Sequence, residues 1–320
     1  NIIFSLYLRA GVLRSERKAA RLCEMVDEQL ERVRAGQPVE TRHLSAINRR
    51  LSRVSNLLAF DRVLEQLPHQ DALVESYLRQ IEPSVLYLAT VYRRRESTQA
   101  AYFCYFLAQH RILRQMPMDE IQRIVVAFIE KDSLYCRVNA LKALCMFGSA
   151  ETITDTLLRC DRQSSFLHAK VLVETLLSFS GDPRELIRLI WARFDRFSAT
   201  MQRALLDYIR FCSGDYGAQM LRILLDEKRD KELRLSAIRY FGRYPSPDAK
   251  EILLRFVSDA DPAHWEYAAV SASALSAYPG EDITAALAEA MHSANWYVRY
   301  NAASSLEGRD LSYEDLDVHI

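Results

Sequence analysis

The sequence has few helix-breaking residues and none of the short motifs that mark common catalytic sites. Only nine Gly and nine Pro occur in 320 residues, which argues against a low-complexity or disordered chain. No GxGxxG, Walker loop, GxSxG or HExxH motif is present, so the sequence gives no support to a dinucleotide-binding enzyme, a P-loop NTPase or a common hydrolase. Strict apolar/polar alternation does not persist, whereas apolar residues recur at spacings of three and four. These features predict an all-α protein.

An excess of charge of one sign is also lacking. Lys and Arg number 42, as do Asp and Glu, whereas binding to a nucleic-acid backbone needs a basic footprint. We therefore expect nucleic acid not to be the partner. The six cysteines form no CxxC pair and lie in apolar stretches, which predicts buried free thiols and a reducing compartment.

The first residues combine an apolar run with a basic cluster, an order typical of the cytoplasmic end of a membrane-spanning helix. Residues 1–8 are mostly apolar, but eight residues cannot span a bilayer. We expect residues 1–36 to form a membrane-proximal helix beside a transmembrane anchor; the alternative is an ordinary amphipathic first helix. The candidate membrane-proximal basic residues are Arg9, Arg14, Arg17, Lys18 and Arg21.

Residues 41–117 are predicted to form an N-terminal helical module. A helix beginning at Thr41 carries apolar residues at steps of three and four, a short heptad seam. We expect this helix to pack antiparallel to the first one, with coiled-coil dimerisation as the alternative. Further helices are predicted at 71–81, 83–94 and 97–114. The seam consists of Leu44, Ile47, Leu51, Val54 and Leu58.

A pattern of about 32 residues recurs through the rest of the chain. Each anchor position is followed three residues later by an apolar residue, and such a period is the signature of a solenoid of stacked helix pairs. We therefore predict a right-handed α-solenoid over residues 118–307 and an acidic tail over 308–320. The anchors are Arg137, Lys170, Arg203, Arg234, Tyr267 and Arg299. The predicted pairs are 119–130 with 134–147, 150–160 with 164–179, 183–195 with 198–212, 215–227 with 231–243, 247–258 with 263–277, and 281–292 with 295–307.

The segments 132–144, 230–241 and 293–306 resemble the turn and second helix of HEAT repeats. They read DSLYCRVNALKAL, DKELRLSAIRYF and SANWYVRYNAASSL, and the short period matches the compact HEAT-like subtype. This resemblance implies that the turn Asp and the Arg of the second helix are structural. The residues to which it assigns that role are Asp132, Arg137, Asp230, Arg234 and Arg299.

Some HEAT-like proteins are enzymes, and the resemblance opens three such alternatives. The di-iron hydroxylases use His-Glu pairs, but no His-Glu dipeptide occurs here, so we expect no metal site and no cofactor. A bilin-lyase-like role would need a tetrapyrrole pocket that no short motif identifies. A DNA-glycosylase-like groove would combine basic, aromatic and acidic residues. The residues available for that combination are Asp207, Arg210, Arg239, Arg243, Trp265 and Trp296.

A binding surface is the remaining candidate for function. Tyr, Trp and Arg are enriched at interface hot spots and gather in the last three predicted pairs. We expect a non-catalytic scaffold or adaptor for a protein partner, at the cytoplasmic face of a membrane if anchored and otherwise in the cytoplasm. The alternative for the two tryptophans is that they fill the joints between repeats. The candidate partner-binding residues are Arg239, Tyr240, Arg243, Tyr244, Trp265, Tyr267, Trp296 and Tyr300.

Overall fold

Helices make up all of the regular structure that is described. The computed structural model describes residues 2–68, 71–110, 119–163, 167–259 and 261–309, and side chains of the first helix from Ser15 onward. Within these ranges there are eighteen α-helices and three short 3-10 helices, and no strand. The all-α prediction is confirmed. The chain forms two compact units, Asn1–Leu189 and Ile190–Ile320.

The first unit is built from helices that pack in two rows. Helices α6, α8 and α10 follow one another in one row, and α5, α7 and α9 in the other. The helices are α1 (Ile2–Arg34), α2 (Thr41–Leu51), α3 (Val54–Glu65), α4 (Ala72–Gln80), α5 (Glu82–Arg93), α6 (Ser97–His110), α7 (Asp119–Ile129), α8 (Leu134–Phe147), α9 (Ala150–Arg162) and α10 (Ala169–Leu177). Helix α11 (Pro183–Ala192) contains the division between the two units.

The second unit repeats the same arrangement with greater regularity. The second helices of its pairs, here called the B helices, are α12, α14, α16 and α18, and each packs against the next. The first helices, α13, α15 and α17, each pack against the B helix that follows them in the chain. The elements are η1 (Phe194–Arg196), α12 (Ala199–Cys212), α13 (Gly217–Leu225), α14 (Lys231–Arg243), α15 (Pro247–Val257), η2 (Pro262–His264), α16 (Trp265–Ala274), η3 (Leu275–Ala277), α17 (Glu281–Ala290) and α18 (Trp296–Glu307). The predicted solenoid of helix pairs is confirmed.

The domain boundary predicted at residues 117/118 falls outside the described residues and stays a prediction. Among the described helices on either side of it, α6 packs against α8 and α5 against α7. Paired packing therefore begins before the region in which the 32-residue pattern can be recognised.

The continuous helix predicted from Thr41 is wrong, because the chain breaks at Ser52 and Arg53. Ser52 donates to the carbonyl of Asn48 at 2.6 Å, and the Asn56 amide donates to the carbonyl of Arg50 at 2.8 Å. Short polar side chains that bind backbone carbonyls in this way compete with helix continuation. The heptad seam is thereby divided between α2 and α3, and its last member, Leu58, is 42% exposed.

The first helix ends as its sequence predicts. Leu22, Val26 and Leu30 are buried on one stripe. At the C-terminus, Gly36 has a φ of 72°, and the Gln37 N–H donates to the carbonyl of Arg32 at 2.9 Å, the pattern of a Schellman cap. Among the described helices none has the length and apolar character needed to cross a bilayer. The predicted anchor falls outside the described residues and stays a prediction.

The repeat arginines bind backbone carbonyls at the turns. Arg234 Nε donates to the carbonyl of Leu224 at 3.0 Å, at the end of the preceding helix. Arg299 binds two turn carbonyls, at 2.7 and 2.9 Å, and Arg137 binds the carbonyl of Asp132 at 3.5 Å. These contacts support the structural assignment, because a cation satisfies carbonyls that a helix end leaves unpaired.

The turn aspartates do not all act alike. Asp230 caps α14 by accepting a hydrogen bond from the Glu232 N–H at 2.9 Å. In the first predicted repeat Asp132 is exposed, and the capping side chain is Ser133, which accepts from the Cys136 N–H at 3.4 Å. Of the repeat arginines, Arg234 also reaches the next repeat, where Nη1 lies 3.3 Å from the Tyr267 hydroxyl.

Candidate functional site

Exposed aromatic side chains gather at the N-terminal ends of α16 and α18. Trp296, Tyr297 and Tyr300 are 57%, 56% and 58% exposed. Asn295 caps α18 by accepting from the Tyr297 N–H at 2.9 Å, which places Trp296 and Tyr297 in the first helical turn. Trp296 stacks on Tyr300 with ring centroids 5.1 Å apart, and the half-buried Trp265 of α16 stacks on Tyr297 at 5.4 Å. These four residues are called the aromatic cluster below.

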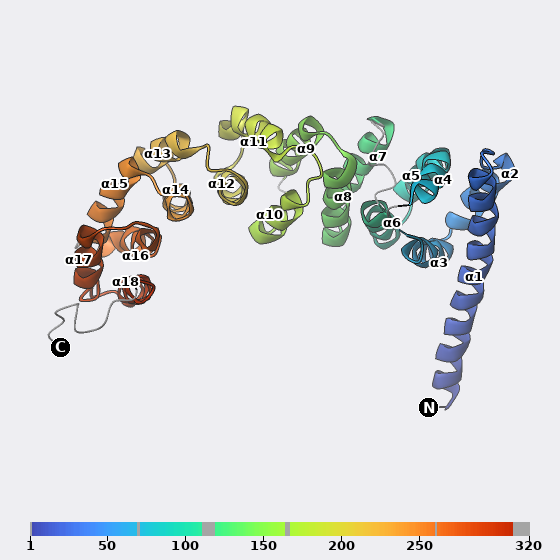
Figure 1. Cartoon of the computed structure of the whole chain (residues 1–320), viewed down its shortest axis with the longest axis horizontal. Helices are drawn as coiled ribbons and strands as arrows, with labels where there is room; N and C mark the ends of the chain where they lie inside the picture. The colour runs from blue at the N-terminus through green and yellow to red at the C-terminus, as the bar shows by residue number, and fades with distance from the viewer. Residues whose placement is uncertain (1, 69–70, 111–118, 164–166, 260, 310–320) are drawn as a thin grey trace. The chain divides into compact units, whose positions relative to one another are not determined.

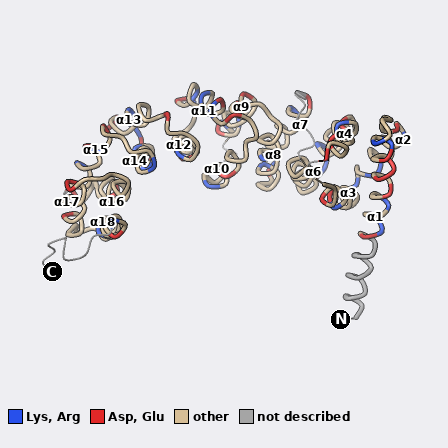
Figure 2. The backbone as a smooth tube through the Cα atoms, in the orientation of Figure 1, with Lys and Arg blue, Asp and Glu red and all other residues tan. Residues whose placement is uncertain are grey.

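A groove with three arginines lies near the C-terminal ends of α12, α14 and α16. Its volume is about 550 Å³, and basic residues are visible on α14 in Figure 2. It is called the arginine groove below. The residues that line it are Arg210, Phe211, Arg239, Gly242, Arg243, Val270, Ser273, Ala274, Ser276 and Asn301. No acidic residue is among them.

Two of the three arginines of this groove contact one aromatic ring. The guanidinium carbons of Arg210 and Arg243 lie 4.8 and 5.5 Å from the centroid of Phe211, within the range of a cation–π contact. Arg210 also pairs with Asp207 at 3.1 Å. Arg239 is half-buried, and burial lowers the pKa of its guanidinium below the ordinary value, because desolvation disfavours the charged form.

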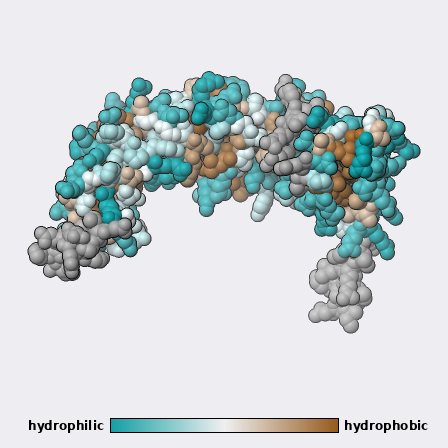
Figure 3. Space-filling model, viewed as in Figure 1, coloured by the Kyte–Doolittle hydropathy of each residue, from teal (hydrophilic) through white to brown (hydrophobic). Residues whose placement is uncertain are grey.

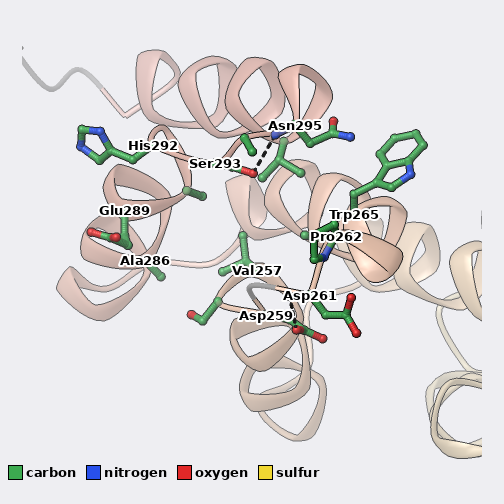
Figure 4. Close-up of a pocket in the computed structure, with 15 residues that line it drawn as sticks. Val257, Asp259, Asp261, Pro262, Trp265, Ala286, Glu289, His292, Ser293 and Asn295 are labelled. Carbon is green, nitrogen blue, oxygen red and sulfur yellow. Dashed lines mark hydrogen bonds between the residues drawn. The ribbon is translucent and has the colours of Figure 1, made fainter.

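A second cleft, of about 490 Å³, lies at the turns that join α15 to α16 and α17 to α18. Figure 4 shows Val257 directed into it, with Asp259, Asp261 and Glu289 around its edge. The pKa of Asp259 is lowered by the backbone N–H of Asp261 and by the His264 ring. No Lys or Arg is among the residues that line this cleft. Trp265, at its rim, links it to the aromatic cluster.

The aromatic cluster and the arginine groove are two sites on one layer of helices. Trp265 begins α16, and Ser273 of the groove lies eight residues later in the same helix. At 1.5 Å per residue this separates them by about 12 Å along the helix axis. Over α14 to α18 the surface visible in Figure 3 is mostly hydrophilic or neutral, as expected for a face rich in Tyr, Trp, Ser and Arg.

Six of the eight candidate partner-binding residues lie at least partly on the surface. Trp296, Tyr300 and Trp265 belong to the aromatic cluster, and Arg239 and Arg243 line the arginine groove. The remaining one is Tyr244, a half-buried residue.

For two candidates the prediction is wrong. Tyr240 is 1% exposed and its hydroxyl accepts from the Tyr216 N–H at 3.0 Å. Tyr267 is 9% exposed and stacks on Phe256, with ring centroids 5.1 Å apart. Both side chains turn toward neighbouring helices, where they contribute to packing.

Two further aromatic residues lie on the surface, and of these Phe211 was missed. Tyr297 directly follows Trp296 at the start of α18, and both positions of that turn are exposed. Phe211 precedes Arg243 by 32 residues, one repeat period, and this equivalence was the signal that could have found it.

Of the basic N-terminal residues, Arg17 and Arg21 are exposed, and Lys18 is exposed and donates to the Ser55 hydroxyl at 2.9 Å. The side chains of Arg9 and Arg14 lie outside the described part.

The residues proposed for a glycosylase-like groove do not converge on one point. Asp207, Arg210 and Arg239 are neighbours, but the Asp207 carboxylate is engaged with Arg210 at 3.1 Å. Trp265 and Trp296 lie in the aromatic cluster, near the opposite ends of the helices. Within the described ranges, no three His, Cys, Asp or Glu side chains are placed to hold a metal ion.

The cysteines are free, three of them buried and three half-buried, so the burial prediction holds for half of them. Burial raises the pKa of Cys145 to about 12 and that of Cys136 to about 11. A raised pKa suppresses the thiolate, which is the nucleophilic form. These thiols are therefore packing residues.

Comparison with known proteins agrees with the geometry of the second unit. Residues 218–309 match the family model of HEAT repeats, over the region in which the helix pairs are most regular. No curated protein matches the chain. The match covers α14 to α18, the aromatic cluster, and all of the residues that line the arginine groove except Arg210 and Phe211. Residues 218–309, with their stacked helix pairs, are therefore HEAT-like repeats.

Proposed function

We propose that this protein is a non-catalytic scaffold that binds a protein partner through the B helices of its second unit. HEAT repeats in general mediate protein interactions, and residues 218–309 carry them. The observation on which the proposal rests is the aromatic cluster, in which three adjacent aromatic side chains are each more than half exposed.

Exposed, stacked Trp and Tyr rings suit a binding surface for physical reasons. Each offers a large apolar area with few rotatable bonds, and such residues dominate interface hot spots. Trp296 and Tyr300 hold each other in place by stacking at an interplanar angle of 19°, so less side-chain entropy is lost when a partner covers them.

The test is a pull-down with the full-length protein from its native host, comparing the wild type with a Trp296→Ser/Tyr300→Ser variant. We expect a specific partner to be retained by the wild type and lost by the variant. The matched control is Tyr135→Ser, which alters an aromatic residue 78% exposed in the first turn of α8, the equivalent place in an earlier repeat. A partner lost equally from both variants, or from neither, would remove the aromatic cluster from the binding surface.

We also propose that the protein acts at the cytoplasmic face of a membrane. The exposed side chains of Arg17 and Arg21 on α1 support this, since basic residues near an anionic surface contribute roughly 1 kcal/mol each. The test is co-sedimentation with phosphatidylserine vesicles. Substitution of both arginines by Gln is expected to reduce binding, and unchanged binding would argue against the membrane-facing role of this cluster.

A further inference from the structure

The arginine groove holds positive charge that its own surroundings do not neutralise. Two carboxylates lie near Arg239, those of Asp207 and Glu232. Each is already engaged: Asp207 with Arg210 at 3.1 Å, and Glu232 with Arg203 at 3.2 Å. Among the residues that the structure describes, none forms a salt bridge with Arg239 or Arg243.

Arg239 is the least well compensated of these groups. Desolvation is the largest influence on its pKa and lowers it, which is the opposite of what an adjacent anion would do. Its neighbour Arg210 has a buried Nε with no hydrogen-bond partner among the described residues. Buried donors of this kind are normally satisfied, so this side of the groove is short of oxygen acceptors.

The rest of the lining suits a small anionic group on a flexible chain. The hydroxyl group of Ser273 adds a polar contact, whereas that of Ser276 already donates to the Ser273 carbonyl at 2.8 Å, and Phe211 provides an apolar wall that is 43% exposed. Gly242 allows α14 to lie close to α16, because a Cβ there would be only 3.1 Å from the Cα of Ala274. About 550 Å³ accommodates a few side chains.

The charge of the whole unit distinguishes between kinds of anion. Residues 190–309 contain 15 Lys and Arg against 16 Asp and Glu, so the groove is a local basic site on a slightly acidic unit. A long polyanion such as duplex DNA needs a continuous basic surface. A short acidic stretch of a protein needs only the groove itself, because Arg binds carboxylates through two parallel hydrogen bonds.

We propose that the arginine groove binds an acidic segment of the protein partner, with adjacent Asp or Glu carboxylates held by Arg239 and Arg243 beside Phe211. This proposal rests on the scaffold function proposed above and adds the chemistry of the partner. The aromatic cluster, whose Trp265 lies about 12 Å from Ser273 along α16, would contact a different part of that partner.

The test measures fluorescence anisotropy of a labelled ten-residue glutamate peptide titrated with the full chain. We expect saturable binding that weakens at least tenfold in an Arg239→Gln/Arg243→Gln variant and weakens as salt is raised from 50 to 300 mM, since exposed charges are then screened. The matched control is Arg222→Gln/Arg255→Gln, which removes the same charge from exposed positions on α13 and α15. Far-UV circular dichroism checks that both variants fold.

Three results would overturn the proposal. The first is no saturable binding of the peptide, or equal weakening by the control variant. The second is tighter binding of a 20-base-pair DNA duplex with the same dependence on the two arginines, which would assign the groove to nucleic acid. The third is tighter peptide binding by a variant ending at Arg309, which would make the chain's own acidic residues 310–320 the occupant.

The outcome is separable from that of the scaffold proposal. If the glutamate peptide fails to bind while the native partner still depends on Trp296 and Tyr300, only the acidic-segment proposal is wrong. If the peptide binds and no partner depends on the aromatic cluster, the groove remains an acidic-peptide site and the role of the cluster is refuted.

Discussion

Tyr240 on α14 and Tyr300 on α18 belong to B helices of the same unit, yet their substitution should have different consequences. Tyr240 is 1% exposed, and its hydroxyl is the acceptor for the Tyr216 N–H at 3.0 Å. Tyr240→Phe keeps the ring but leaves that N–H without its acceptor. A buried donor left unsatisfied costs about 1–3 kcal/mol; because Tyr216 is only half-buried, we expect the free energy of unfolding to fall by about 1 kcal/mol.

Tyr240→Ala removes the ring as well. Its packing against Phe241 and Tyr244, with centroids 5.6 and 4.9 Å away, is then lost and a cavity remains. Aromatic-to-Ala changes in a core cost about 3–5 kcal/mol. Tyr300 is 58% exposed, and surface changes usually stay within about 0.5 kcal/mol. Tyr300→Ala should therefore leave stability unchanged and impair partner binding alone.

The measurement is urea unfolding of the full chain, monitored by far-UV circular dichroism. The quantity compared between variants is the urea midpoint of the transition of the second unit. Tyr300→Phe serves as the matched control for Tyr240→Phe. The reasoning is refuted if Tyr240→Phe unfolds at the wild-type urea midpoint, or if Tyr300→Ala lowers the free energy of unfolding by more than about 1 kcal/mol.

Three further predictions concern other contacts. Arg234→Met removes the hydrogen bond to the Leu224 carbonyl and the cation–π contact with Tyr267 at 4.9 Å, which should lower unfolding free energy by about 2 kcal/mol; a urea midpoint equal to that of wild type would contradict this. His43 is buried, and burial lowers its pKa to about 4 from 6.5. As the pH falls, the imidazole of His43 is therefore protonated in the unfolded chain before it is protonated in the folded one. The free energy of unfolding is expected to fall by roughly 3 kcal/mol between about pH 6.5 and 4. Urea titrations across this range should show a flatter pH dependence for His43→Gln, and parallel curves would count against the assignment. Gly242→Leu should push α14 away from α16, because the added side-chain atoms meet Ala274. The free energy of unfolding should fall by about 1–3 kcal/mol, and an unchanged thermal midpoint would show that the two helices can separate freely.

Much of the architecture could be predicted from local patterns, and each success has a local cause. Helices α14 and α18 begin after Asp230 and Asn295, whose side chains cap them, and α1 ends where Gly36 adopts a positive φ. The 32-residue period requires stacked pairs, since one pair cannot bury its own apolar face. A break such as the one at Ser52 was missed because its hydrogen bonds compete with an otherwise unbroken apolar period.

The surface could not be predicted in the same way. A B helix packs against its own partner and against the B helices before and after it, so only a narrow strip remains exposed. A small rotation of the helix decides whether a Tyr faces solvent or a neighbour, which is why Tyr240 is buried while Tyr300 is exposed. Periodicity does not specify that rotation; packing against the adjacent repeats does.

By itself, the sequence determined the helical class and the paired repeats, because these depend on spacings along the chain; the resemblance to HEAT repeats implied a structural role for Arg234. Only the tertiary structure decided that Arg210, Arg239 and Phe211 form one groove and that Trp265 and Tyr297 stack in a separate cluster. These residues come from different repeats. Their proximity depends on how successive helices stack, which is set by side-chain packing such as the close approach at Gly242.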